Sequence, residues 1–277
     1  MKHTAKKRFG QNFLTDEYVI AQIINLINPQ LNDCMVEIGP GLAALTHPLS
    51  ERVKQLYLIE LDRDIVQTLQ QTKFANQVII HAADALNFDY NVERFLSNNI
   101  SDNNVLNNST PLNNNQKIRI VGNLPYNIST PLLFHLAKFN NIRDMHFMLQ
   151  KEVVDRICAK PDNGDYGRLS VMLQYRFDCN KLLEVSNKSF TPIPKVESAI
   201  IRLKPKPAEL WQHIDEKKLN HVVTTAFNQR RKTISNSLKS LFTAETLNKL
   251  GINIQKRAEN LSVAEYLKLA TILSGKP

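Results

Sequence analysis

The sequence predicts an α/β protein in which a doubly wound parallel sheet is followed by a small helical domain. From Cys34 onward, short β-branched runs alternate with segments of helical period, which is typical of a parallel sheet covered by helices. The proline-alternating segment Lys204-Pro-Lys-Pro207 ends this alternation, and the rest of the chain is helical in period without a convincing strand. A chain of 277 residues suits one main domain and one smaller domain, so we expect domains at residues 1–207 and 208–277.

Each predicted strand is a short apolar or β-branched run, and each predicted helix has an apolar face of helical period. Strands are expected at Met35–Ile38, Leu56–Glu60, Val78–His81, Ile118–Val121, Met145–Leu149, Lys181–Val185 and Ser198–Leu203. Helices are expected at Leu42–Arg52, Arg63–Thr72 and Pro131–Phe139. Ligands of a doubly wound sheet bind beyond the carboxyl ends of its strands, so the residues at those ends are the candidate site.

An asparagine-rich segment precedes the Ile118 strand. Between residues 97 and 115, asparagine occupies 9 of 19 positions, with little apolar content and no period. Such a segment cannot bury enough apolar surface to offset its ordering entropy, so we expect a mobile inserted loop. It interrupts no motif, and the chemistry of the site should be unaffected by it.

Composition narrows the class of protein. Hydrophobic residues make up 43% and charged residues 22%, as in soluble globular proteins, and no apolar stretch approaches the roughly 18 residues that a membrane span requires. The basic start has no apolar run behind it, so we expect no signal peptide, no membrane association and a cytoplasmic protein. The three cysteines and seven histidines show neither disulfide nor metal spacing, so no metal is predicted.

The net charge of +9 is concentrated at the two ends of the chain. Residues 1–10 carry +4 and residues 204–277 carry +7, whereas residues 11–203 carry −2. Two basic ends on a near-neutral body suit an enzyme that grips nucleic acid, with Lys6, Lys7 and Arg8 at the first end. Solvated surface lysines would give the same pattern, and charge alone leaves these two interpretations about even.

A glycine turn follows the first strand. Val36-Glu-Ile-Gly-Pro-Gly41 ends a strand and opens a helix, and Gly39, Gly41 and Ala44 satisfy the dinucleotide fingerprint GxGxx(G/A). A nicotinamide enzyme is therefore one candidate. The acidic Glu37 favours S-adenosylmethionine, whose sites commonly have an acid that supports this loop near the amino-acid end of the cofactor.

Acidic residues end the next two strands. Glu60 comes 21 residues after Gly39, where a carboxylate can accept both ribose hydroxyls of an adenosine. Asp84 ends the third strand, where it would accept the adenine amino group, although a lone aspartate there is more commonly a turn or helix cap. Because Asp84 lies in register with Gly39 and Glu60, we favour ligand binding as its role.

The most specific motif, Asn123-Leu-Pro-Tyr126, ends the fourth strand. The amino nitrogen of adenine is a poor nucleophile because its lone pair is delocalised, and fixed hydrogen-bond acceptors stabilise the more tetrahedral form that can attack a methyl group. The Asn123 side-chain oxygen and the Leu124 carbonyl are candidate acceptors. Tyr126 offers a face on which an extruded base can stack, and Pro125 stiffens the turn.

With these motifs the chain resembles the bacterial small-subunit ribosomal RNA adenine N6-dimethyltransferases, the kasugamycin-resistance dimethyladenosine transferase family. The resemblance spans essentially the whole chain. It rests on Arg8-Phe-Gly-Gln-Asn-Phe-Leu14, Val36-Glu-Ile-Gly-Pro-Gly41, Ile59-Glu-Leu-Asp62, Asn123-Leu-Pro-Tyr126, Ser189-Phe-Thr-Pro192 and Ala226-Phe-Asn-Gln-Arg-Arg-Lys-Thr233. It implies a Rossmann-like class I methyltransferase domain.

The resemblance also implies the site and the reaction. Gln11, Asn12 and Leu14 would line the methionine and ribose side of S-adenosylmethionine, and Phe190 would sandwich the target base against Tyr126. A buried loop anchor is the commoner role for a lone phenylalanine such as Phe190. The implied reaction is four methyl transfers, two on each of two adjacent adenosines in a 3′-terminal hairpin loop of small-subunit (16S) rRNA. The implied substrate is a partly assembled pre-30S subunit, and we expect a monomer that uses no metal.

The helical domain carries a dense basic cluster at Arg230, Arg231 and Lys232, which we expect on a helix that binds RNA phosphates. A solvated helix face is the alternative.

Two rival functions remain: an assembly or transcription factor that has lost methylation, and a large-subunit adenine methyltransferase of the macrolide-resistance kind. The intact Glu60, Asp84 and Asn123 motif argue against the first, and the long basic tail argues against the second.

Overall fold

The fold was analysed in a computed structural model that describes residues 11–91, 95 and 117–275. The chain forms two compact units, the first of residues 1–151 and 181–204 and the second of residues 152–180 and 205–277. The longer segment of the second unit begins at residue 205, within the predicted linker and at the end of β9 (Ser198–Pro205). The unit also takes in residues 152–180, which we had placed with the sheet. The Asn-rich segment 97–115 and the basic residues Lys6, Lys7 and Arg8 lie outside the described residues.

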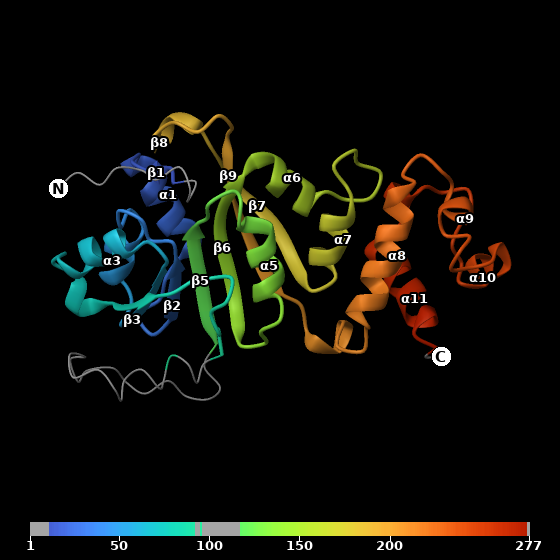
Figure 1. The fold of residues 1–277 in the computed structure, drawn as a ribbon, viewed down its shortest axis with the longest axis horizontal. Helices are drawn as coiled ribbons and strands as arrows, with labels where there is room; N and C mark the ends of the chain where they lie inside the picture. The colour runs from blue at the N-terminus through green and yellow to red at the C-terminus, as the bar shows by residue number, and fades with distance from the viewer. Residues whose placement is uncertain (1–10, 92–94, 96–116, 276–277) are drawn as a thin grey trace. The chain divides into compact units, whose positions relative to one another are not determined.

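A seven-stranded sheet confirms the doubly wound α/β fold (Figure 1). Its strands lie in the order β4 (Ile79–Ala82), β3 (Gln55–Glu60), β2 (Cys34–Ile38), β5 (Ile118–Asn123), β6 (Ile142–Gln150), β9 and β7 (Phe177–Val185). The first five strands in this order are parallel, and β9 pairs antiparallel with β6. Chain order runs outward from β2 on one side through β3 to β4, and on the other side from β5 to β6. The strand order therefore reverses between β2 and β5, which is where doubly wound sheets bind their ligands.

All seven predicted strands are present, and β6 and β7 begin three and four residues earlier than predicted. A separate two-residue pair, β1 (Phe13–Leu14) and β8 (Phe190–Thr191), joins the start of the chain to the turn-rich segment.

The helices of the first unit are α1 (Glu17–Ile27), α2 (Thr46–Ser50), α3 (Arg63–Gln70) and α5 (Ser129–Leu136). Aspartates cap the first and third of these, because Asp16 accepts from the Tyr18 and Val19 amides and Asp62 accepts from the Asp64 amide. The predicted helix over 42–52 is wrong in length. Ala43 adopts a φ of 69°, so residues 41–45 form turns and α2 begins only at Thr46.

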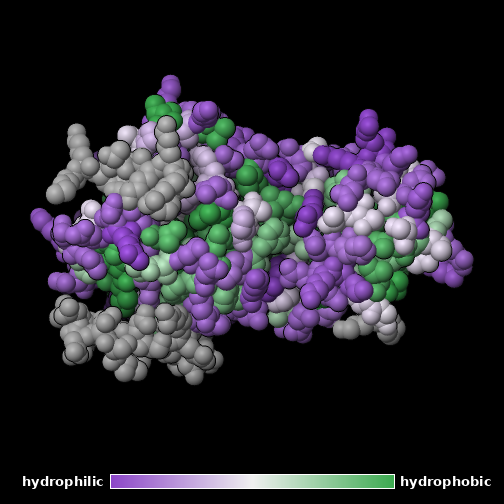
Figure 2. Space-filling view, in the orientation of Figure 1, coloured by the Kyte–Doolittle hydropathy of each residue, from purple (hydrophilic) through white to green (hydrophobic). Residues whose placement is uncertain are grey.

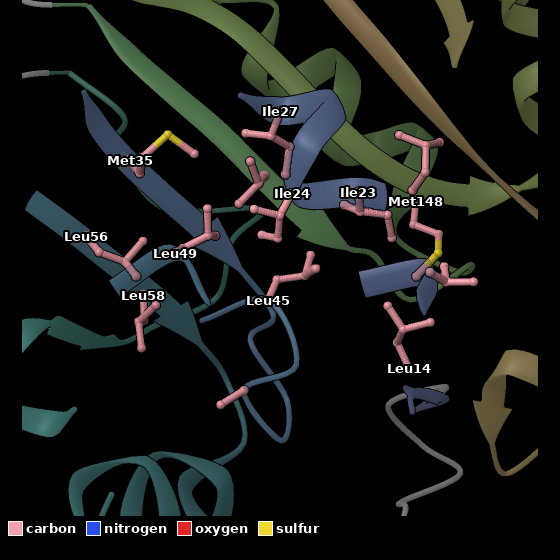
Figure 3. Close-up of a cluster of buried hydrophobic side chains, with 14 of the residues drawn as sticks. Leu14, Ile23, Ile24, Ile27, Met35, Leu45, Leu49, Leu56, Leu58 and Met148 are labelled. Carbon is pink, nitrogen blue, oxygen red and sulfur yellow. The ribbon is translucent and has the colours of Figure 1, made fainter. Parts of the chain in front are cut away.

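The hydrophobic core of the first unit lies between α1 and the strands (Figure 3). Ile23, Ile24 and Ile27 are each 2% exposed and point from one face of α1 toward Met35 on β2 and Met148 on β6. Their spacing of three and four residues places them on a single side of the helix. This packing holds β2 and β6 in place behind the strand ends that form the candidate site.

The second unit is helical apart from the start of β7. Its helices are α6 (Lys151–Cys158), α7 (Arg168–Gln174), α8 (Glu216–Asn228), α9 (Ile234–Ser237), α10 (Ala244–Lys249) and α11 (Val263–Leu273). α8 packs against α7 and α11, and its buried face of Leu219, Val222, Val223 and Ala226 has the spacing of one helix side. None of the helices within the described residues is long and apolar enough to span a membrane.

Candidate active site

The carboxyl ends of β2, β3, β4 and β5 surround a cavity of about 320 Å³ in the first unit. Its volume is within the range of small-molecule pockets, roughly 300–1,000 Å³. Of the predicted site residues, those that line the cavity are Gln11, Asn12, Leu14, Glu37, Gly39, Gly41, Glu60, Asp84, Asn123, Leu124 and Tyr126. Five segments separated in sequence thus converge at the point where the strand order reverses.

The glycine turn after β2 requires both of its glycines. Gly39 and Gly41 have φ angles of 64° and 54°, a conformation that residues with a Cβ rarely adopt. The amide of Gly39 donates to the Ile59 carbonyl at 2.9 Å, which ties the turn to β3. A Cβ at Gly41 would lie 3.1 Å from the ring of Phe13, so the backbone here passes closely under an aromatic side chain. The turn therefore presents bare backbone to the cavity.

Glu37 is a buried carboxylate at the cavity wall. It is 2% exposed, and its Oε2 has no hydrogen-bond partner among the residues that the structure describes. Burial raises the pKa of Glu37 to about 8, and the negative charge of Glu60 acts in the same direction. A buried polar atom with no protein partner at a cavity wall is a position that a ligand can satisfy.

Glu60 closes the other side of the glycine turn. It is the last residue of β3, is 7% exposed, and accepts a hydrogen bond from the Asp62 amide at 2.8 Å. Burial raises the pKa of Glu60, while backbone amides, including those of Asp62 and Gly41, partly oppose this shift. Gln11 donates from Nε2 to Asp62 Oδ2 at 3.2 Å, so the segment before β1 is bound to the same corner.

Asp84 caps a turn and lines the cavity at the same time. Its Oδ1 accepts from the Leu86 amide at 2.9 Å, and its Oδ2 accepts from Asn87 Nδ2 at 2.8 Å. The capping role that a lone aspartate commonly has is therefore present here. Each carboxylate oxygen has a second lone pair, so the cap leaves capacity to accept from a ligand.

The Asn123 motif is held at several points. Asn123 Nδ2 donates to the Asn12 carbonyl at 3.0 Å, and because a carbonyl only accepts, this contact orients the amide and leaves Oδ1 as its acceptor atom. The amide of Leu124 donates to the Met148 carbonyl at 3.2 Å, which fixes the motif to β6. Ser129 Oγ donates to the Tyr126 carbonyl at 3.1 Å. The motif is thus a rigid edge of the cavity with an oriented acceptor.

Phe190 does not line the cavity. It is 2% exposed, pairs with Leu14 across β1 and β8, and packs in the hydrophobic core. The structure therefore places it where a buried loop anchor would be, and the base-binding role that the resemblance implies stays a prediction. Farther along this segment, Ile193 and Val196 are 63% and 43% exposed, and Figure 2 shows hydrophobic side chains at the surface over the chain that follows β8.

The basic cluster of the second unit lies on the turn between α8 and α9, so its predicted helical position is wrong. Arg230 is bound within the unit, with its Nε 2.6 Å from Glu259 Oε2 and a guanidinium donor 2.5 Å from the Gly164 carbonyl. Arg231 and Lys232 are exposed. The three residues are therefore not equivalent, and the latter two are the better candidates for RNA contact.

Phe13 and Leu61 are among the cavity residues to which sequence reasoning had assigned no role. Phe13 lies over Gly41, and the signal for it was its place between the predicted residues Asn12 and Leu14. Leu61 is 53% exposed although it is large and apolar, and it directly follows Glu60. The exposure of this apolar residue beside Glu60 could be learned only from the structure. Across the described residues, no group of three or more metal-ligating side chains is present.

Comparison with known proteins is consistent with this geometry. A family model described as ribosomal RNA adenine dimethylase matches residues 2–274. The ribosomal RNA small subunit methyltransferase A of Haemophilus ducreyi is 50% identical over 99% of this chain and 91% of its own length. The protein of the same name from Chromobacterium violaceum is 49% identical over 99% of this chain and 98% of its own.

Two solved structures share the fold. A dimethyladenosine transferase from Plasmodium falciparum superposes with a TM-score of 0.76 at 22% identity, covering 95% of this chain and 98% of that one. The 23S rRNA methyltransferase ErmE superposes with a TM-score of 0.68 at 23% identity, covering 95% and 100%. With the family model matching nearly the whole sequence, the chain belongs to the ribosomal RNA adenine dimethylase family and is an rRNA adenine methyltransferase.

Proposed function

We propose that this enzyme uses S-adenosylmethionine to dimethylate N6 of two adjacent adenosines in a 3′-terminal hairpin loop of 16S rRNA. The observation that carries the proposal is the joint lining of one cavity by the ends of four parallel strands. Glu60, Asp84 and Asn123 are part of this lining, and we assign them to an adenosine. The names of the relatives at about half identity support the small subunit as the source of the RNA.

The donor set fits the cofactor. The Glu37 carboxyl group has an oxygen without a protein partner beside the glycine turn, and it would accept a hydrogen bond from the amino-acid end, whose positive charge would favour the ionised form of this acid. Glu60 and Asp84 would accept from the ribose hydroxyls and the adenine amino group. Gln11, Asn12 and Leu14 would close the methionine and ribose side. When bound, S-adenosylmethionine supplies an electrophilic methyl group on a sulfonium centre, and no metal is required for that displacement.

The chain itself prepares the target nitrogen. Asn123 Oδ1 and the Leu124 carbonyl would accept the amino hydrogens of adenine and stabilise its more tetrahedral form. Because Asn12 fixes the Asn123 amide, this acceptor is oriented before the base arrives. Tyr126 would stack on the base, and the departing proton goes to solvent, so no residue is assigned as a general base.

Recognition of the RNA would rest on positive charge outside the cavity. We assign it to Arg231 and Lys232, with Lys6, Lys7 and Arg8 from the N-terminal segment. The substrate would be the pre-30S particle during small-subunit assembly, met in the cytoplasm by a monomeric enzyme.

Methyl transfer from labelled S-adenosylmethionine to three substrates tests the proposal. The substrates are undermethylated small subunits, large subunits and naked rRNA, and mass mapping locates any dimethyladenosine. We expect label in the small-subunit particle at two adjacent adenosines.

Asn123→Ala should abolish transfer while RNA affinity stays nearly unchanged. Label only in large subunits would refute the proposal. Full activity of Asn123→Ala would refute the role of this residue in it.

A further inference from the structure

A buried serine from another strand contacts the aromatic residue of the target pocket. The hydroxyl of Tyr126 lies 2.9 Å from Ser198 Oγ, a hydrogen bond between residues 72 positions apart. Ser198 is 1% exposed and does not line the cavity, so it reaches the site only through Tyr126. Its side chain therefore acts on the tyrosine and on nothing that enters the pocket.

The sheet fixes where Ser198 lies. It is the first residue of β9 and pairs with Gln150, the last residue of β6, in a continuous antiparallel register. Directly beside this pair, the Lys151 amide donates to the Glu197 carbonyl at 2.9 Å. A side chain at such a position is supported by the backbone on both sides, which makes it a stable anchor.

Tyr126 is consequently held at both ends. Ser129 Oγ binds its main-chain carbonyl, and Ser198 Oγ binds its phenolic hydroxyl. With the backbone and the far end of the ring both restrained, the ring can present one face to the cavity without searching other rotamers. An aromatic surface that is oriented in advance does not lose this side-chain freedom when a base stacks on it.

We propose that Ser198 is a positioning residue for methyl transfer, which orients the ring of Tyr126 for the target adenine. The inference rests on the proposed function, since it takes adenine as the stacked group. It extends the site beyond the cavity lining, to the strand that follows the segment carrying Phe190. It also gives the tyrosine hydroxyl a role that stacking alone does not require.

A mutant cycle separates positioning from simple stability. Ser198→Ala and Tyr126→Phe should each lower the single-turnover rate constant at saturating RNA by about three- to tenfold, the range for one neutral hydrogen bond. The double variant should be no slower than the slower single variant, because both changes remove the same bond. Tyr126→Ala should be far slower than Tyr126→Phe, since it removes the stacking face as well.

A matched control is Ser50→Ala, which removes another buried serine hydroxyl of the same unit, bound to the His47 carbonyl at 2.8 Å away from the cavity lining. It should lower the melting temperature about as much as Ser198→Ala and leave the rate constant unchanged. RNA and cofactor affinities of Ser198→Ala should stay near wild type, so that its effect falls on the rate and not on binding.

An activity-independent measurement tests the bond itself. In protein labelled with ¹³C at the tyrosine Cζ, the Tyr126 signal is identified by its loss in Tyr126→Phe. We expect this signal to move in Ser198→Ala and to stay in place in Ser50→Ala. If the wild type fails to methylate rRNA, the proposed function fails, and the signal still decides whether Ser198 holds Tyr126. An unmoved signal, or rate losses that simply multiply in the double variant, would overturn the inference.

Discussion

Polar side chains at the strand ends hold the local backbone and face the cavity at the same time. Glu60 accepts the Asp62 amide, Asp84 caps the turn at Leu86, and the Asn123 amide binds the Asn12 carbonyl. In each case one lone pair or donor orders the side chain, and a remaining acceptor points to a ligand role. The local bond thus orients the acceptor that we assign to the ligand.

Glu60 provides the first test at this scale. Glu60→Ala should weaken S-adenosylmethionine binding by about 1.5–3 kcal/mol for each charge-assisted hydrogen bond lost. Because Glu60 also holds the Asp62 amide, Glu60→Gln should be milder, since it keeps one oxygen to accept that amide. Calorimetric titration measures the affinities, with Glu51→Gln, an exposed acid outside the cavity lining, as control. Wild-type affinity in Glu60→Ala would remove this residue from the site.

Glu37 gives the protein a pH-dependent stability. Burial raises its pKa from the usual 4.5 to about 8, so between these values the folded protein keeps a proton that the unfolded chain releases. Stability from this group is complete below pH 4.5 and is lost as pH rises toward 8, with a slope of at most about 1.4 kcal/mol per pH unit. Glu37→Gln should flatten this dependence in urea unfolding measured from pH 5 to 8. If the free energy of unfolding changed with pH in the same way in both proteins, the raised pKa of Glu37 would be wrong.

Residues at the ends of strands could be predicted because their position follows from the fold and their chemistry from their type. Eight such residues, including Glu37, Glu60 and Asn123, line one cavity together with the segment of residues 11–14, which only the family resemblance implied. Phe190 and Ser198 show where sequence reasoning stops. The burial of Phe190 depends on the pairing of β8 with β1, and the contact of Ser198 with Tyr126 depends on the register of β9. Neither pairing leaves a periodic signal in so short a stretch of sequence.

At the scale of elements, the turn between α8 and α9 carries the separable RNA-binding prediction. Arg230 is bound to Glu259 within the unit, so replacing it would mix stability with recognition. Replacing Arg231 and Lys232 by Gln should lower the salt slope of log K for the small subunit by up to about 1.4–1.8, at roughly 0.7–0.9 per neutralised phosphate. S-adenosylmethionine affinity should not change.

The same unit offers a charge-matched control for this pair. Lys217 and Lys218 are exposed in the first turn of α8, and replacing both by Gln changes the net charge by the same amount. A binding series in increasing salt, after circular dichroism has established intact helices, compares the two double variants. If the Arg231/Lys232 variant and the Lys217/Lys218 variant both kept the wild-type salt slope, the turn would be only a solvated surface. RNA contact would then be sought at Lys6, Lys7 and Arg8.

Element boundaries were predictable where apolar period and strand-end motifs coincide, as in β2, β3 and β5. The helix over 42–52 was overextended because its period runs on through Ala43, whose left-handed backbone no side-chain pattern announces. The basic cluster was placed on a helix for a similar reason. α8 ends at Asn228, where Gln229 leaves helical geometry without a glycine or proline to mark it.

For the whole molecule, the predicted division at a proline-rich linker described only one of the crossings between units. The chain passes into the second unit at residue 152, returns at residue 181 and leaves again at residue 205. The first two crossings fall within α6 and β7, where the pattern of apolar residues is continuous. Composition marks a linker, whereas a boundary inside a helix or strand depends on contacts between distant residues and leaves no local trace.

The first unit separates stability from chemistry along its strands. Near the amino ends of β5 and β6, away from the cavity, Arg119 is 5% exposed and pairs with Asp33 at 2.6 Å and Asp144 at 2.9 Å. It also donates to the Ile27 carbonyl at 2.6 Å. One guanidinium on β5 therefore joins the end of α1, the residue before β2 and the start of β6. The cluster is a feature of folding, because none of its members lines the cavity.

Arg119→Met should therefore lower the free energy of unfolding by up to about 3–5 kcal/mol, since it removes the buried partner that Asp33 and Asp144 share and leaves them only the half-exposed Arg143, 2.8 Å from Asp33. The comparison is Glu184→Gln, which breaks the partly exposed pair with Lys181 and should cost about 0–1 kcal/mol. Urea unfolding measures both. Calorimetry at a temperature where Arg119→Met is still folded should give wild-type affinity for S-adenosylmethionine. A loss of affinity with little loss of stability would instead mean that the amino ends of the strands are coupled to the site at their carboxyl ends.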